Sequence, residues 1–186
     1  MKVSALLSGG ASPNLREMSD VEGHTPLSFT ASRPATVFFL AATRRAIIRL
    51  LCEAGAEKEA RYAGPQAGLV GFTAVGCAVA SESIPALRAL AAAGASLDAP
   101  QGVAPAQWPP LWLAIDRKLE AVANVLLDLG ASAAASVAGP GGETLLQAAV
   151  RQKLRMSVLA QRLRSAAAGK SVSAAGAATV VDGDGG

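Results

Sequence analysis

The sequence is poor in the residues on which catalysis and metal binding most often depend. Its 186 residues include one histidine, two cysteines and one tyrosine, and aromatic residues make up 4% of the chain. Because no obvious secretory signal accompanies them, Cys52 and Cys77 indicate free thiols in a reducing compartment. Both thiols fall where a helix is expected to face the core, which favours packing over reactivity. We therefore expect no enzymatic activity.

Long apolar runs and a strong charge of one sign are also missing. The longest apolar stretch, residues 67–80, contains glycine and threonine and is shorter than a bilayer requires. The net charge of +3 is too small to indicate nucleic-acid binding by itself. We expect no membrane span and a cytoplasmic location, with the nucleus as an open alternative.

What the sequence does contain is a recurring phrase, Leu-Leu-x-x-Gly-Ala. Its copies, one of them weakened, occupy residues 6–11, 50–56, 89–95 and 126–131. Self-similarity at a period of roughly 30–40 residues indicates stacked units rather than one globular core.

Each unit is predicted to contain two short helices followed by a loop. In one unit the first helix covers residues 73–80, and the second begins near Pro85 and ends at Gly94 in a left-handed cap. In the next unit the first helix opens at Pro109 and the second ends at Gly130. Gly94 lies 21 positions after Thr73, and Gly130 lies 21 positions after Pro109, so the two units share one register.

These residues resemble the ankyrin repeat, whose units open with Gly-x-Thr-Pro-Leu-His and close with Leu-Leu-x-x-Gly-Ala. Residues 23–27 match the opening, and residues 142–149 open a further unit. The resemblance covers residues 4–164 and implies an all-α, ankyrin-like helix-turn-helix solenoid with long finger loops. The expected divisions are a partial unit at 3–20, units at 21–66, 67–104 and 105–138, a capping unit at 139–164, and a flexible Ala/Gly/Ser tail at 165–186.

The pattern has three departures from the family. Thr25 lies 30 positions before Gly55, nine more than elsewhere, so that either 28–34 is an inserted loop or 36–42 is the first helix of a shortened unit. The histidine of the opening motif is replaced by other residues, which predicts an array less rigid than a consensus one: Ser28, Gly76, Trp112 and Gln147. The copy at 6–11 lacks its first half, which indicates that the array begins before this chain or docks its N-terminal end on a partner.

The resemblance implies a scaffold that binds another protein through a concave face, with no cofactor and no small-molecule ligand. That face is lined by the finger tips and the ends of the first helices. Carried over by position, its residues are His24, Phe72, Ser81, Trp108, Asp116, Arg117, Glu143 and Arg151. Phe72 and Trp108 fall on adjacent fingers and suggest an apolar anchor pair, with burial against neighbouring loops as the open alternative. His24, at a finger tip, has no metal-ligand neighbours at suitable spacing.

Two other functions remain open at this point. The array could be the substrate-recognition part of a larger enzyme or of a ubiquitin-ligase adaptor. A basic segment at 151–164 could instead make a weak contact with nucleic acid or an anionic membrane. Its basic residues are Arg151, Lys153, Arg155, Arg162 and Arg164.

Overall fold

The structure of the chain, a computed structural model, is all-α in the part that it describes. The described residues are 2–16, 23–33, 38–64, 68–104, 106–133, 139, 142–152 and 158–167. Their helices are α1 (Lys2–Ser8), α2 (Pro26–Ser32), α3 (Phe38–Glu53), α4 (Ala74–Ala80), α5 (Ile84–Ala92), α6 (Pro110–Asp116), α7 (Glu120–Asp128), α8 (Leu145–Arg151) and α9 (Val158–Ala167). The described ranges contain no strand, although an isolated bridge joins Gln101 and Trp108. The predicted all-α class is confirmed, and none of the described helices has both the length and the apolar character needed to cross a bilayer.

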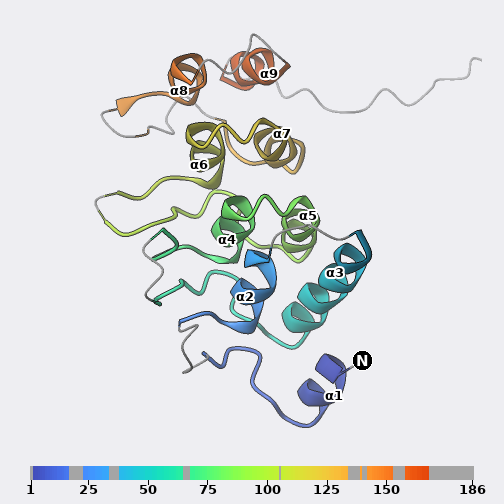
Figure 1. Cartoon of the computed structure of the whole chain (residues 1–186). Coiled ribbons are helices and arrows are strands. Elements are labelled where there is room, and N and C mark those ends of the chain that lie inside the picture. The colour runs from blue at the N-terminus through green and yellow to red at the C-terminus, as the bar shows by residue number, and fades with distance from the viewer. Residues whose placement is uncertain are drawn as a thin grey trace, which may run out of the picture.

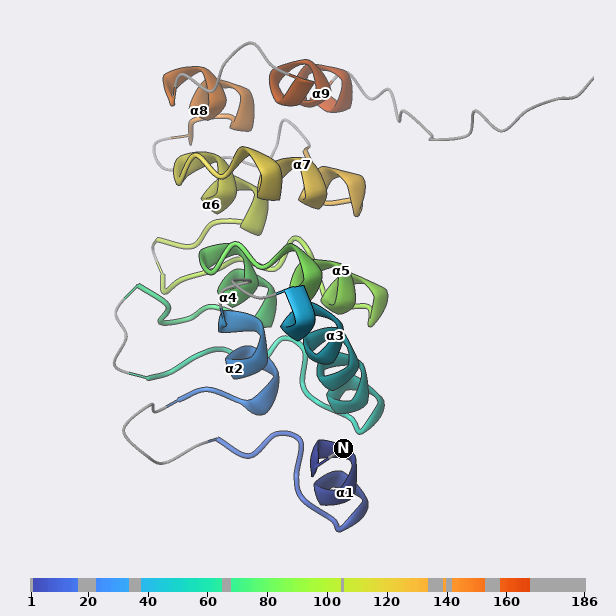
Figure 2. The ribbon, with the colours of Figure 1, turned by 45° about the vertical axis from the view of Figure 1, so that its right-hand side comes forward.

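The helices lie in two layers that follow the chain from one end of the molecule to the other (Figures 1 and 2). One layer holds α2, α4, α6 and α8, and the other holds α1, α3, α5, α7 and α9. Each helix from α2 to α9 contacts its partner in the other layer as well as neighbouring helices of its own layer, and α1 packs against α3. The core is built from buried Leu, Ile, Val and Ala side chains. Long loops extend from the α2–α8 layer on the side away from the second layer (Figure 2).

Second helices end in one recurring backbone motif. The motif glycines have φ values of 87°, 88°, 76° and 93° at Gly10, Gly55, Gly94 and Gly130. In the last copy the Gly130 N–H donates to the Leu127 carbonyl at 3.1 Å, and the Ala131 N–H donates to the Leu126 carbonyl at 2.9 Å. The other copies repeat both bonds. These bonds satisfy carbonyls that a helix end leaves unpaired, and they require the left-handed conformation that glycine adopts most easily. The left-handed caps predicted at Gly94 and Gly130 are confirmed.

The long first unit is explained by neither of the two alternatives. Residues 28–32 belong to helix α2, which Thr25 caps, so they are not an inserted loop. Residues 38–42 open the second helix, α3, so they are not the first helix of a shortened unit. Helix α3 has 16 residues, whereas α5 and α7 have 9 each. Seven of the nine extra positions therefore lengthen α3, and the connection before it takes the other two.

The C-terminal boundary also needs a correction. The flexible tail was expected from residue 165, but α9 continues to Ala167. Its buried side chains, among them Leu159 and Leu163, pack this helix against the preceding pair. Residues 168–186 of the expected tail lie outside the described ranges.

Replacing Gly130 by alanine should lower the free energy of unfolding by about 1 kcal/mol. A left-handed residue with a Cβ costs about 1–2 kcal/mol, of which the stiffer unfolded chain returns a part. The new Cβ would meet nothing within 4 Å, so the loss is conformational rather than steric. Urea unfolding measures it, and Gly68→Ala is the matched control because Gly68 is equally open but has no positive φ. Equal stability of both variants would contradict the role given to the cap.

Candidate functional site

The candidate site is the finger face, defined here as the surface formed by α4, α6 and α8 together with the loops that precede them. The loops are held in register by side chains placed four residues after a capping glycine. Each accepts a backbone N–H from the following unit. The acceptors are Asn14, Glu59 and Asp98, and their donors are Glu57, Ser96 and Ser132, at 2.7, 2.8 and 2.8 Å. We call this series the carboxamide–carboxylate ladder.

A second series uses arginines placed six residues after the capping glycine. Arg16 donates to the Arg61 carbonyl at 3.0 Å, and Arg61 donates to the Pro100 carbonyl at 2.9 Å. Arg61 also donates to the Gly71 carbonyl at 2.7 Å, which joins the two arms of one finger. Neither series was found from the sequence, although the equal distances from the glycines were there to be seen.

Gln101 packs beside Gly76, which stands where the opening motif of the ankyrin repeat would have histidine. The Thr73 N–H donates to the Gln101 Oε1 at 2.8 Å, and the Gln101 Nε2 donates to the Thr73 hydroxyl at 3.2 Å. Gln101 is fully buried, and its amide occupies the space that a Cβ on Gly76 would need. A residue from the following finger thus caps the start of α4, and glycine in the histidine slot makes room for it.

The other residues that replace the motif histidine also make contacts within the fold. Ser28 and Gln147 each close a capping box with the threonine that precedes their helix. Trp112 is 1% exposed, as expected for a residue that packs between units. Its ring lies 5.7 Å from that of Trp108, measured between centroids. The lower rigidity inferred from the missing histidines stays a prediction.

Two residues expected at exposed finger tips are buried instead. His24 is 4% exposed, with its Nδ1 at 3.0 Å from the Ser28 hydroxyl and its ring centroid 4.2 Å from that of Tyr62. Phe72 is 6% exposed, because its finger folds into a turn in which the Tyr62 N–H donates to the Phe72 carbonyl at 2.7 Å. The exposed position given to His24 is therefore wrong, and for Phe72 the structure agrees with the open alternative of burial against neighbouring loops. Trp108 is half-buried and packs against the core.

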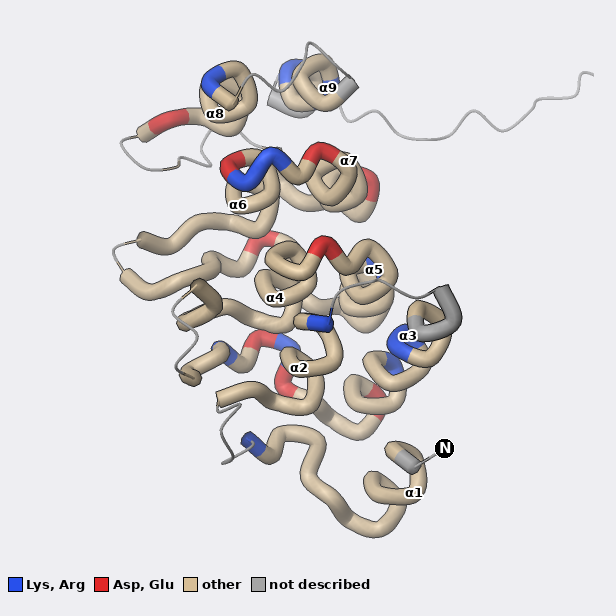
Figure 3. The backbone as a smooth tube through the Cα atoms, in the orientation of Figure 1, with Lys and Arg blue, Asp and Glu red and all other residues tan. Residues whose placement is uncertain are grey.

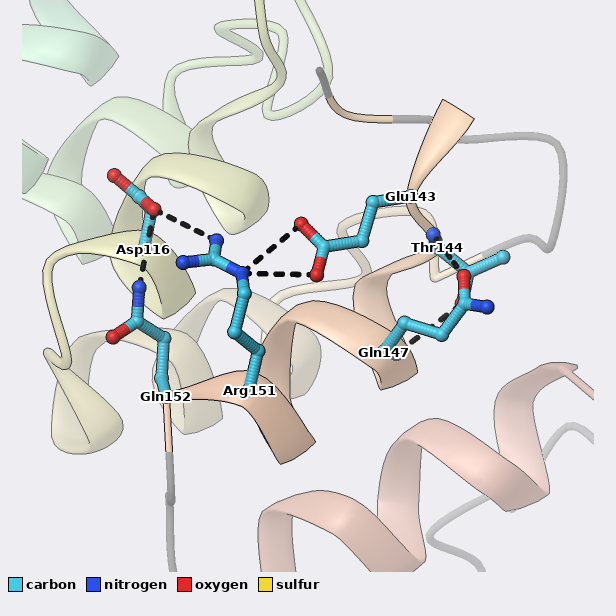
Figure 4. A network of polar contacts seen from close by, with 6 residues as sticks. All are labelled: Asp116, Glu143, Thr144, Gln147, Arg151 and Gln152. Atoms are coloured by element: carbon cyan, nitrogen blue, oxygen red, sulfur yellow. Dashed lines mark hydrogen bonds and ion pairs between the residues drawn. The ribbon is translucent and has the colours of Figure 1, made fainter. Parts of the chain in front are cut away.

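Three of the predicted residues meet in one polar cluster (Figure 4). The Arg151 Nε donates to Glu143 Oε1 at 3.0 Å, and its Nη2 donates to Asp116 Oδ1 at 3.2 Å. Gln152 donates to the same Asp116 oxygen at 3.2 Å. Hydrogen bonds first to Glu143 and then to Asp116 favour the charged form, and so they raise the pKa of the Arg151 guanidinium. The cluster joins α6 to α8 and to the loop that precedes α8.

The remaining predicted residues lie close to this cluster or serve the fold. Arg117 is exposed at the end of α6, and its guanidinium carbon lies 5.7 Å from the centroid of the Phe72 ring. Ser81 is half-buried, and its hydroxyl donates to the Ala31 carbonyl at 3.0 Å, joining α4 to α2. This contact gives Ser81 a structural role that the sequence did not indicate.

The cysteines and the basic segment show little that supports chemistry. Burial raises the pKa of Cys77 to about 12, and burial also raises the pKa of Cys52, which is half-buried rather than in the core. Among the described residues, no group of three or more His, Cys, Asp or Glu side chains is placed to hold a metal ion. In the basic segment, Arg162 donates to Asp128 at 2.7 Å and Arg164 is exposed. Lys153 and Arg155 lie outside the described residues.

Comparisons with known proteins place the chain in no family. No protein-family model matches the sequence, and a search of curated proteins finds no match.

A double-mutant cycle tests whether Gly76 and Gln101 depend on each other. Gly76→Ala should push the buried amide away and cost about 1–3 kcal/mol of stability. Gln101→Ala should cost about 1–3 kcal/mol, because it leaves the buried Thr73 N–H without its acceptor. The double variant should cost less than the sum by about 1 kcal/mol, since the added methyl group then occupies freed space.

The control for this cycle is Gln107→Ala. Gln107 lies in the same loop but is exposed, so its loss should change stability by less than about 0.5 kcal/mol. Urea unfolding of all four proteins gives the coupling energy, and strict additivity would show that Gly76 and Gln101 act independently.

Proposed function

We propose that the chain is an ankyrin-like helical repeat array that binds another protein through the finger face and catalyses no reaction. The recurring helix pairs, the repeated glycine caps and the stacked fingers support this assignment. We further propose a cytoplasmic location, on the argument of two unpaired thiols.

The observation that carries the proposal is the polar cluster of Asp116, Glu143 and Arg151. Its side chains are surface-accessible, with 50% of Arg151 and 41% of Asp116 exposed, yet their geometry is fixed by bonds between neighbouring elements. Arg117 adds a second exposed cation beside them, and Trp108 offers an aromatic surface in the loop before α6. An aromatic side chain beside charged groups of both signs is typical of the residues that anchor and orient a protein partner.

The same cluster indicates what the partner surface should contain. Arg151 is already paired with two carboxylates, whereas among the described residues Arg117 makes only the weaker contact with the Phe72 ring. A partner carboxylate would therefore find Arg117 the more available guanidinium. Charged groups at an interface rim chiefly set orientation and association rate, so binding should weaken as salt rises.

The test compares partner capture by three forms of the full chain. Arg117→Glu combined with Trp108→Ala alters the finger face, whereas Arg164→Gln alters an exposed charge on α9. The wild type and the Arg164→Gln form should enrich the same proteins from a cell extract. The finger-face variant should enrich these proteins about tenfold less, which corresponds to about 1.4 kcal/mol of binding free energy. Quantitative mass spectrometry measures the enrichment, and the dissociation constant is then measured with the purified partner.

Circular dichroism and thermal unfolding are the fold controls for this comparison. If the variant keeps the helical signal and melting temperature of the wild type but captures the same partners equally well, the finger face is not the binding surface. If Trp108→Ala unfolds the array, Arg117→Glu alone carries the test, because its side chain is exposed.

A further inference from the structure

A pocket of about 600 Å³ lies between α3 and α5, in the other helix layer from the finger face. Its lining includes three arginines, Arg45, Arg49 and Arg88, together with the acidic Glu53. The rest of the lining is small: Cys52, Ala89, Ala92 and Ala93. No residue of this pocket belongs to the site predicted from the sequence.

The arginines of the pocket outnumber its acidic side chains. Arg49 lies 3.6 Å from Glu53, in an exposed pair one helical turn apart. Arg45 and Arg88 make no ion pair or hydrogen bond with any described residue. Figure 3 shows the basic positions of α3 and that of α5 on adjacent helices. Two guanidinium groups with open hydrogen-bonding positions thus face an open space that has an alanine floor.

The equivalent space between α7 and α9 shows how the chain fills such a position. There Arg162 of α9 donates to Asp128 of α7 at 2.7 Å and to the Asn124 side chain at 3.2 Å. Helices α5 and α9 can be aligned by three buried positions with the same spacing, which are Ala86, Leu87 and Leu90 in α5 and Leu159, Ala160 and Leu163 in α9.

In this alignment Ala89 stands where Arg162 stands. Between α7 and α9 an internal arginine–carboxylate pair closes the space. Between α3 and α5 the long side chain is missing and the space is open. Glu53 stands two positions before Gly55, as Asp128 stands two positions before Gly130, and it is the carboxylate that pairs with Arg49. The three arginines of the pocket therefore outnumber its one carboxylate, and a bound carboxylate would balance the excess positive charge.

The shape of the pocket favours a peptide over a small molecule. Small-molecule sites enclose most of their ligand, whereas Arg45, Arg49 and Arg88 are all exposed. Two neighbouring helices with an alanine floor between them form a groove, and an amphipathic helix can lay its apolar side into such a groove. Guanidinium groups on both walls can then bind carboxylates on the two flanks of that helix, often through two parallel hydrogen bonds each.

We propose that the α3–α5 pocket binds an acidic amphipathic helix of another protein. Its apolar side chains contact Ala89, Ala92 and Ala93, and its Asp or Glu side chains pair with Arg45, Arg49 and Arg88. This site is separate from the finger face, so either proposal can fail without the other.

The experiment uses a labelled peptide of about 16 residues that has leucine at helical spacing and glutamate on both flanks. Fluorescence anisotropy should show binding to the full chain that weakens as salt is raised. A pocket variant with Arg45→Gln, Arg49→Gln and Arg88→Gln should lose at least about tenfold in affinity. The matched control removes the same charge elsewhere through Arg33→Gln, Lys118→Gln and Arg164→Gln, all at exposed positions, and it should bind like the wild type.

Cys52 provides a second readout inside the pocket. Saturating peptide should slow its modification by a thiol reagent at least about tenfold, because the bound helix covers it. Cys77 is completely buried and should stay unmodified with or without peptide, which checks that the chain remains folded. Circular dichroism of the pocket variant provides the same check for the arginine substitutions.

Three results would overturn the proposal. One is equal affinity of the pocket variant and the charge-matched control. Another is equal binding of a peptide with the same composition but a scrambled order, which would reduce the effect to charge attraction alone. The third is protection of Cys52 by glutarate as strong as that by the peptide, which would indicate a site for small carboxylates.

Discussion

The left-handed glycine at the end of each second helix is the constraint on which the rest of the array depends. It stops the helix at a fixed point and turns the chain toward the fingers, so every later position in the unit can be counted from it. The ladder acceptors stand four residues after it and the bridging arginines six. A shift of one residue at this turn would misplace the acceptor, and with it the finger that carries the candidate site.

Sequence reasoning predicted the regular units well because their signals are local. A glycine after a run of leucines and a Thr-Pro or Pro-Pro opening each depend on a few neighbouring residues. The first unit could not be predicted in the same way, since lengthening α3 by seven residues leaves both local signals unchanged. The buried His24 and Phe72 also depend on how one finger packs on the next, which no spacing within one unit contains.

The two proposed binding sites follow from the same layered arrangement but use opposite chemistry. On the finger face Asp116, Glu143 and Arg151 are already paired with one another, so that a partner finds a fixed pattern of both signs. In the α3–α5 pocket two arginines are open and the floor is apolar, so that a ligand must supply the opposite charge. The first site was predicted in part from motif positions. The second could not be, because Arg49 and Arg88 look like ordinary solvent-facing residues until the helices are placed side by side.

The carboxamide–carboxylate ladder has an end, and this gives the array a direction. Its last described bond joins Asp98 to Ser132. Four residues after the capping Gly130 the sequence has Ala134, which has no side-chain acceptor. Besides its buried side chains, the joint between the α6–α7 pair and the α8–α9 pair has the ion pairs of Arg151 and Arg162, which salt screens. Hydrogen exchange would therefore begin at the last helix pair and advance inward, with the ladder-linked units as the slowest to open.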